Sequence, residues 1–192
     1  MISNGVKKSH VIGIVVIAGL CIGVAVLLIH SQGFTLGIES TTSTPTSVGK
    51  SSGRAVPAGE KEYYNPQYKF SLLYPNNLTA AEHDEGAGAM TIIFEYDDKK
   101  TLEGFQVFIV PFSGSQITDD RFKQDIPSGV RKDLKEIKID GATGASFYSE
   151  NDVLGETAEV WFLRGGYLFE VNTFKELAPW LDTILQTWKF TP

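Results

Sequence analysis

The sequence predicts an α+β fold, a mostly antiparallel sheet of about seven strands with helices packed on it, after an N-terminal transmembrane helix. Three observations predict it. Val11 to Ile29 is a long apolar run without a charged side chain. Apolar and polar residues alternate in several segments after Tyr63, a period of two that is typical of strands with one buried face. The last apolar stripe of the chain instead repeats with the period of a helix.

The apolar run over Val11–Ile29 is the predicted membrane anchor. Its 19 residues would form a helix of about 28 Å, close to the ~30 Å thickness of a bilayer core. A cleaved signal peptide has a shorter apolar core and a small-x-small cleavage site, which Ser31-Gln32-Gly33 matches poorly. We therefore expect an uncleaved signal anchor over 11–30, after a short N-terminal segment over 1–10.

Basic residues set the expected orientation of this single-pass anchor. Lys7 and Lys8 precede the run, and the next Lys or Arg after it is Lys50. The positive-inside bias then places the N-terminus in the cytoplasm and the rest of the chain outside it. Without these two lysines, the 17 basic side chains fall to 15, against 23 acidic ones. This acidic balance disfavours nucleic acid as a partner.

Residues 31–61 form a predicted flexible tether, and 62–192 the folded domain. Ser40 to Gly53 consists mostly of Ser, Thr, Gly and Pro, so it has little apolar surface to offset the entropy of ordering. A chain that starts near Gly59 is therefore expected to be as stable as the whole exterior part.

The first strands of the domain follow from alternation. Tyr68 to Tyr74 places an apolar residue at every second position, and Pro75 to Asn77 ends the strand. Leu78 to His83 predicts a weaker strand and Met90 to Tyr96 a strong one. Phe105 to Phe112 is apolar at both alternating sets of positions, which predicts a central strand covered on both faces.

A short helix is predicted next. Thr118 is a suitable N-cap, and the two aspartates that follow it suit the positive end of the helix dipole. Pro127 would close the helix, with Phe122 and Ile126 on its buried face.

Two hairpins follow the short helix. The first joins Glu136–Ile139 to Ala145–Ser149 through an Asp-Gly turn. The second joins Thr157–Arg164 to Tyr167–Phe174, and the two glycines between them can adopt positive φ.

A closing helix ends the predicted fold. Its apolar stripe has helical spacing and comprises Leu177, Trp180, Leu181, Ile184, Leu185 and Trp188. Pro179 is tolerated because it lies in the first turn. Trp188 to Phe190 is expected to add a short final strand at a sheet edge.

Two of these segments resemble one known family. Tyr68-Lys69-Phe70-Ser71-Leu72-Leu73-Tyr74-Pro75 resembles the opening motif of PsbP-like domains, which are named after an extrinsic subunit of photosystem II. Leu181 to Phe190, a helix that runs into Trp-Lys-Phe, resembles the closing motif of the same family. The resemblance implies an antiparallel sheet with helices on both sides, and a role in binding rather than in catalysis.

The residues themselves also predict no catalytic centre, no metal site and no cofactor. Cys21, the one cysteine, lies within the predicted span, and His83 is the one histidine of the predicted domain. Ligands for zinc are therefore lacking. The serines lack a nucleophile-elbow context, and Gly86-x-Gly88 precedes a strand rather than a helix. The chain is accordingly not expected to be an enzyme.

Acidic pairs are the remaining candidates for chemistry. Asp84-Glu85, which lies beside His83, Asp97-Asp98 and Asp119-Asp120 are interpreted as loop, turn and cap residues. The alternative is a hydrolase that uses paired carboxylates, which requires two facing carboxylates with raised pKa values in a concave pocket.

Aromatic residues supply the candidate binding site. Tyr63 and Tyr64 precede the first predicted strand and are the best candidates for exposure. Trp161 either packs under a helix or lies exposed, with packing favoured. Asn77-Leu78-Thr79 fits the glycosylation sequon, and an unmodified turn is the favoured alternative.

The predicted function is therefore a membrane-anchored extracytoplasmic binding or assembly module. Its expected partners are the lipid bilayer, through 11–29, and another extracytoplasmic protein, which would need an exposed apolar patch of several hundred Å². The alternative is a small-ligand carrier, which would show an apolar cavity between sheet and helix.

Overall fold

The computed structural model describes residues 51–96, 103–126, 128–151 and 155–192. The predicted anchor over 11–29 and the tether up to residue 50 lie outside the described residues, as do Asp97, Asp98 and Pro127. In the part of the chain that is described, no helix is both long enough and apolar enough to cross a bilayer.

Strands dominate the structure. They are β1 (Glu60–Asn65), β2 (Phe70–Pro75), β3 (Leu78–Gly86), β4 (Ala89–Tyr96), β5 (Gly104–Pro111), β6 (Lys132–Ile139), β7 (Ala142–Asn151), β8 (Gly155–Arg164), β9 (Tyr167–Phe174) and β10 (Lys189–Phe190). The helices are α1 (Asp119–Asp125) and α2 (Ala178–Leu185), and a 3₁₀ turn over Lys175–Leu177 leads into α2.

The predicted α+β class is wrong. Of the described residues, 56% are in strands and only 14% in helices. The ten strands also exceed the expected seven or so. The two predicted helices exist, but at 7 and 8 residues they are too short to form a layer of their own. The fold is a mostly antiparallel β structure with two short helices.

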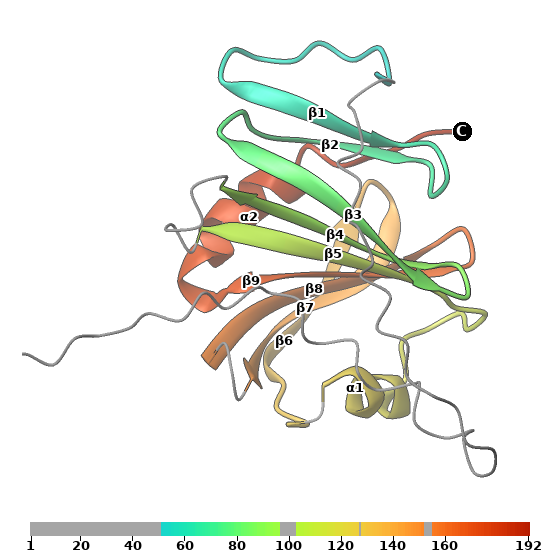
Figure 1. Ribbon diagram of the computed structural model, residues 1–192. Helices are drawn as coiled ribbons and strands as arrows, with labels where there is room; N and C mark the ends of the chain where they lie inside the picture. Colours follow the sequence, from blue (N-terminus) through green and yellow to red (C-terminus); the bar gives the residue numbers. More distant parts are fainter. Residues whose placement is uncertain (1–50, 97–102, 127, 152–154) are drawn as a thin grey trace, which may run out of the picture.

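The strands form two sheets (Figure 1), in which every pairing is antiparallel. The small sheet has the order β1-β2-β10, and the large one has the order β3-β4-β5-β9-β8-β7-β6. Strand β5 lies inside the large sheet between β4 and β9, as its apolar character on both faces predicted. Strand β6 has one neighbour in the described part of that sheet and forms its edge.

The main core lies between the large sheet, the small sheet and α2. Its largest fully buried side chains are aromatic and include Phe70, Phe94, Phe105, Phe162, Phe169 and Trp188. The ring of Trp188 stacks on Phe70 with centroids 4.3 Å apart, so the strand β10 and the motif in β2 meet here. Burial of such rings provides the principal stabilisation of the fold.

A second, smaller cluster lies under α1 on the other face of the large sheet. Phe122 stacks on Trp161 at 4.8 Å, and Phe147 meets both rings edge to face. The predicted cap is confirmed, because the Thr118 hydroxyl accepts a hydrogen bond from the Arg121 amide at 3.2 Å. The predicted burial of Phe122 and Ile126 is also confirmed.

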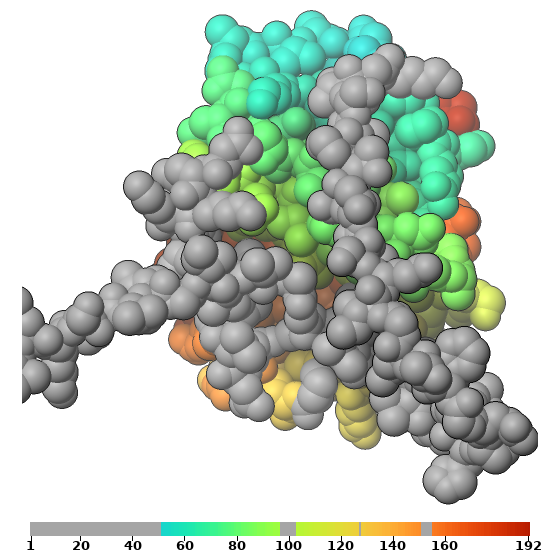
Figure 2. Space-filling view, in the orientation of Figure 1, coloured from blue at the N-terminus to red at the C-terminus, as the bar shows by residue number. Residues whose placement is uncertain are grey.

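The residues that lead into β1 are attached to the domain. Glu62 accepts hydrogen bonds from the Ser52 amide at 3.1 Å and from the Ser51 hydroxyl at 2.8 Å. The Arg54 guanidinium donates to the Thr187 carbonyl at 2.7 Å, just after α2. Residues 51–54 therefore form a clasp on the domain; Figure 2 shows this part of the chain and β1 at the top of the view.

Candidate binding pocket

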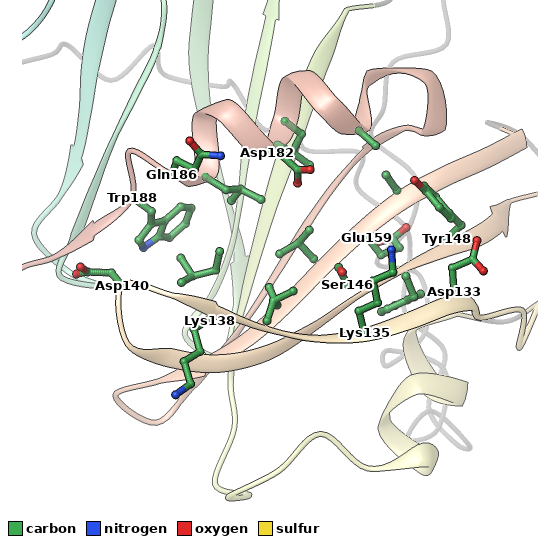
Figure 3. Close-up of a pocket in the computed structure, with 18 of the residues that line it drawn as sticks. Asp133, Lys135, Lys138, Asp140, Ser146, Tyr148, Glu159, Asp182, Gln186 and Trp188 are labelled. Carbon is green, nitrogen blue, oxygen red and sulfur yellow. The ribbon is translucent and has the colours of Figure 1, made fainter.

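A pocket of about 490 Å³ lies between α2 and the strands β6, β7 and β8. Figure 3 shows α2 on one side of it and β6 on the other, with β7 and β8 beneath. The pocket arises because α2 packs over the middle of the large sheet, while the β6–β7 hairpin continues past it to the sheet edge.

The wall of the pocket is mixed, with apolar side chains from α2 and the strands beside charged and polar ones. Alternate residues of a strand face the same side, so β6, β7 and β8 contribute Ile137, Ile139, Ser146, Tyr148, Ala158 and Val160. The helix contributes Ala178, Leu181 and Leu185, which fall at spacings of three and four residues along one face. Leu181 and Leu185 are nearly fully buried. The apolar stripe predicted for the closing helix therefore covers the core and also forms a pocket wall.

Trp188 closes one end of the pocket. Its side chain is 1% exposed, yet its indole Nε1 has no hydrogen-bond partner among the described residues. In Figure 3 the ring nitrogen lies on the side of Asp140, which also lines the pocket. A buried donor without an acceptor is destabilising, because folding has removed its water.

Charged residues surround the mouth of the pocket. Asp140 is already engaged: Oδ2 accepts from the Phe190 amide at 2.8 Å and Oδ1 accepts from Lys189 Nζ at 3.0 Å. Both bonds lower the pKa of Asp140, and the bond from the Phe190 amide has the larger effect. Lys135 extends into the pocket in Figure 3, whereas Lys138 points away from it. Asp133 and Asp182 are exposed and lie at the mouth as well, in β6 and in α2.

A second polar feature is a buried group of carboxylates between α1 and the large sheet. Asp125 and Glu170 share a hydrogen bond, and Arg121 forms ion pairs with both, at 3.4 Å to Glu170. Burial raises the pKa of Glu170 well above its ordinary value and also raises the pKa of Asp125. Burial therefore favours the protonated form of these two carboxyls, more strongly for Glu170.

Glu159 lies close to this pair on the same face of the sheet. Its two oxygens accept hydrogen bonds from the Thr157 hydroxyl at 2.7 Å and from Trp161 Nε1 at 3.2 Å. Burial raises the pKa of Glu159 to about 7. The two hydrogen bonds lower this pKa, but their effect is smaller than that of burial.

The buried carboxylates meet part of the requirement for a hydrolase, since Asp125 and Glu170 face each other with raised pKa values. Neither residue lines the pocket under α2 or a second pocket, of about 580 Å³, beside the β6–β7 hairpin. Glu159 contributes to the wall of the first pocket, but both of its oxygens are occupied. In the described ranges, no His, Cys, Asp and Glu side chains are grouped to hold a metal ion.

The structure separates the three predicted binding residues. Tyr63 lies within β1 rather than before the first strand, is 7% exposed, and packs against Phe70 and Phe94. Burial, followed by the hydrogen bond to Glu82, raises its pKa. Tyr64, the next residue in β1, is half-buried. Trp161 is 1% exposed under α1, as the favoured packing alternative predicted.

The other predicted candidates lie at the surface. His83 is half-buried in β3, and Asp84 and Glu85 are exposed at its end. Asn77 is exposed in the turn between β2 and β3, and its amide donates to the Tyr96 hydroxyl at 3.2 Å. None of these residues lines the pocket under α2.

The pocket and the carboxylate group were both missed in the sequence. The helical stripe in the sequence predicts only a packing role for Trp188, and the strand predicted over Glu136–Ile139 does not include Lys135. One signal was available for the carboxylates. Glu159 and Glu170 occupy alternate positions in two otherwise apolar strands, a pattern that indicates buried carboxyls when a helix covers that face.

Comparisons with known proteins support the fold. No protein-family model matches the chain, and no curated protein matches it either. Among solved structures, it is similar to the solution structure of cyanobacterial PsbP (CyanoP) from Synechocystis sp. PCC 6803. The TM-score is 0.52 at 15% sequence identity, over 74% of this chain and 98% of that chain. At this identity the similarity shows a PsbP-like fold and nothing of function.

Proposed function

We propose that the chain is a membrane-anchored extracytoplasmic binding module without a catalytic centre, and that it binds through the pocket between α2 and β6–β8. The pocket is the observation that carries the proposal. Its volume of about 490 Å³ lies within the usual range for small-molecule sites, roughly 300–1,000 Å³.

The arrangement of polar groups supports binding rather than catalysis. The carboxylates with raised pKa values lie under α1, although Glu159 also contributes to the pocket wall, and their oxygens are bonded to Arg121, Thr157 and Trp161 or to each other. General acid–base chemistry needs such a group within hydrogen-bond reach of the substrate. The pocket itself combines apolar side chains with charged and polar groups, which can orient a bound ligand.

The anchor gives the proposed module its location. Residues 11–29 and the two lysines before them favour an N-terminus in the cytoplasm and a domain outside. A tether of some twenty residues between the anchor and the clasp at Ser51–Arg54 would reach roughly 25 Å. A domain held so close to a bilayer encounters membrane-associated ligands at high effective concentration.

A protein partner is a second candidate, which the β6 edge favours. This strand has one neighbour in the described sheet, and Leu134 on it is 54% exposed. Free strand edges accept an added strand from another protein. Large exposed apolar side chains are otherwise limited, within the described residues, to Val56, so the broad apolar patch expected for docking is not seen there.

Site-specific photo-crosslinking in native membranes tests both candidates. A photoreactive residue at Tyr148, in the pocket, is compared with one at Leu134, on the β6 edge, and one at Thr183, on the exposed side of α2. The proposal expects a small adduct at Tyr148, detected by mass spectrometry, that disappears when Ala158→Phe fills the pocket. A protein adduct at Leu134 alone would favour the second candidate. Equal labelling at all three positions would contradict both.

A further inference from the structure

We propose that two copies of the chain associate edge to edge through β6, in the two-fold register that places Glu136 of each copy opposite Lys138 of the other. The inference goes beyond the proposed function and does not depend on the pocket. Three features carry it: the open edge of β6, the order of charges along the regular part of this strand, and the position of its irregular part.

The open edge is the first feature. Strand β6 is the outermost strand on its side of the large sheet, and β7 is its one neighbour among the described strands (Figure 1). Half of its backbone N–H and C=O groups therefore face away from β7, and such an edge can pair with a further strand. In a closed two-fold dimer β6 would pair with itself in antiparallel fashion.

The charged side chains of this edge lie together on one face. Ile137 and Ile139 face α2 and line the pocket there, so alternation places Glu136 and Lys138 on the opposite face. Figure 3 shows Lys138 pointing away from the pocket, and Glu136 lines the second pocket together with Phe122 of α1. Both are exposed, and neither forms an ion pair with another described residue.

The order of charges selects one register, which is the second feature. Residues directly opposite each other in an antiparallel pair share a face, so the two-fold axis must pass through a residue. With the axis at Ile137, Glu136 and Lys138 form two pairs of opposite charge. An axis at Lys135, Glu136 or Lys138 instead opposes two like charges, and one at Ile139 leads the pairing into the turn that follows β6.

The irregular part of β6 is the third feature. The pairing with β7 shifts register between Lys132 and Lys135, and Asp133 has a φ of 56°. A bulge of this kind discourages pairing at an edge. Residues from Lys135 to Ile139, by contrast, pair with β7 without interruption. The bulge therefore restricts association to the segment in which the charges of the two copies match.

A paired segment this short makes a small interface, so association should be weak in dilute solution. The proposed anchor would hold the copies in one membrane and raise their effective concentration. The test therefore uses the full-length chain in its native membranes, with oxidative cross-linking of introduced cysteines. Cys21, the single natural cysteine, is first replaced by serine.

Ile137→Cys is the first variant, because the register places residue 137 opposite its own counterpart, within the distance that a disulfide spans. We expect a covalent dimer at a yield about fivefold or more above that of Thr183→Cys, on the exposed side of α2, where only chance collisions form a disulfide.

Glu136→Cys and Lys138→Cys test the same register at two exposed positions. Each variant alone should cross-link little, because residue 136 lies opposite residue 138 and not opposite itself. Chains with one cysteine co-expressed with chains that carry the other should form the mixed dimer. This measurement does not require Ile137→Cys to fold.

Charge reversal tests the cause of the register. In the chain with Ile137→Cys, Glu136→Lys alone and Lys138→Glu alone should each lower the dimer yield by about fivefold, because like charges then lie opposite each other. Both reversals in one chain recreate the two pairs of opposite charge and should restore the yield.

Two results would overturn the inference. One is a mixed pair at 136 and 138 that cross-links no better than either variant alone. The other is a double charge reversal that leaves the dimer yield as low as the single reversals do. Neither result bears on the pocket, whose own test is the small adduct at Tyr148.

Discussion

Glu159 is a buried residue whose protonation affects the stability of the fold. It lies inside the cluster under α1, beside Trp161 and close to Glu170. Burial raises its pKa to about 7 from an ordinary value of 4.5. The unfolded chain therefore releases this proton at a lower pH than the folded chain does.

The sign of the resulting pH dependence follows. At pH values below 4.5 both states hold the proton, and stability is at its highest with respect to this group. As the pH rises from about 4.5 to about 7, only the unfolded state loses the proton, so the free energy of unfolding falls, in total by roughly 3 kcal/mol. The raised pKa values of Asp125 and Glu170 act in the same direction.

We predict that Glu159→Gln removes this part of the pH dependence. Glutamine resembles the protonated carboxyl in shape and stays neutral, so the variant should be more stable than the wild type at pH 8 and similar at pH 4.5. Urea unfolding at a series of pH values measures it. Glu156→Gln, at an exposed residue paired with Lys175, is the control and should keep the wild-type slope between pH 4.5 and 7. An unchanged slope in Glu159→Gln would show that Glu159 is ionised in the fold.

Gly144 gives a second prediction at the scale of one residue. A Cβ there would lie 2.1 Å from the Trp161 carbonyl oxygen and 2.6 Å from Phe162 Cβ. Because the backbone of β8 cannot move aside without breaking the β7–β8 pairing, we predict that Gly144→Ala costs at least about 2 kcal/mol. The midpoint of chemical denaturation measures the cost, with Ser146→Ala on the same strand as control. A cost below half a kcal/mol would mean that the two strands are not paired as described.

At the scale of an element, α2 holds the core and forms the pocket wall together. Leu181 is 1% exposed, and we predict that Leu181→Ala lowers the free energy of unfolding by about 2–5 kcal/mol. Thr183→Ala, on the exposed side of the same helix, should change it by less than about half a kcal/mol. Thermal or urea unfolding compares them. Similar small effects in both variants would show that the helix does not pack on the sheet.

The clasp before β1 alters an expectation about the tether. Because Arg54 bonds to the Thr187 carbonyl and the serines bond to Glu62, we predict that a chain starting at Gly59 is less stable than one starting at Ser51. The difference should be about 1–3 kcal/mol, the range for bonds that involve charged groups. Arg54→Ala should reproduce about half of it and Lys123→Ala, on the exposed side of α1, none. Equal melting temperatures for the two chains would restore the original expectation that residues before Gly59 do not stabilise the domain.

How well the elements could be predicted depends on what determines each of them. Alternation located β2, β4, β5, β8 and β9, because each buries one or both faces in a single core. Strand β1 was missed because Glu60-Lys61-Glu62 is charged; its pairing with β2 and the burial of Glu62 under the clasp are properties of the assembled sheet.

The pocket could not be predicted, since its volume depends on how far α2 stands from β6, two elements about forty residues apart in sequence.

For the whole molecule, the topology in the membrane is the prediction that matters most. The uncharged run over 11–29 and the preceding lysines predict that a reporter enzyme fused after Pro192 is active only outside the cytoplasm. Exchanging Lys7 and Lys8 for glutamate is the matched variant and should weaken this preference. A reporter active inside the cytoplasm would contradict the topology and with it the proposed location of the module.

The small sheet has a consequence for how the domain is made. Strand β2 is its middle strand, and one of its two neighbours is β10; the contact between Leu73 and Thr187 joins residues 114 positions apart. During synthesis, β2 therefore has an unpaired edge until nearly the entire domain has been translated. A chain that crosses the membrane as it is made would present this edge outside before β10 arrives. Chaperones on that side are then the factors on which its yield should depend, more than those that act before export.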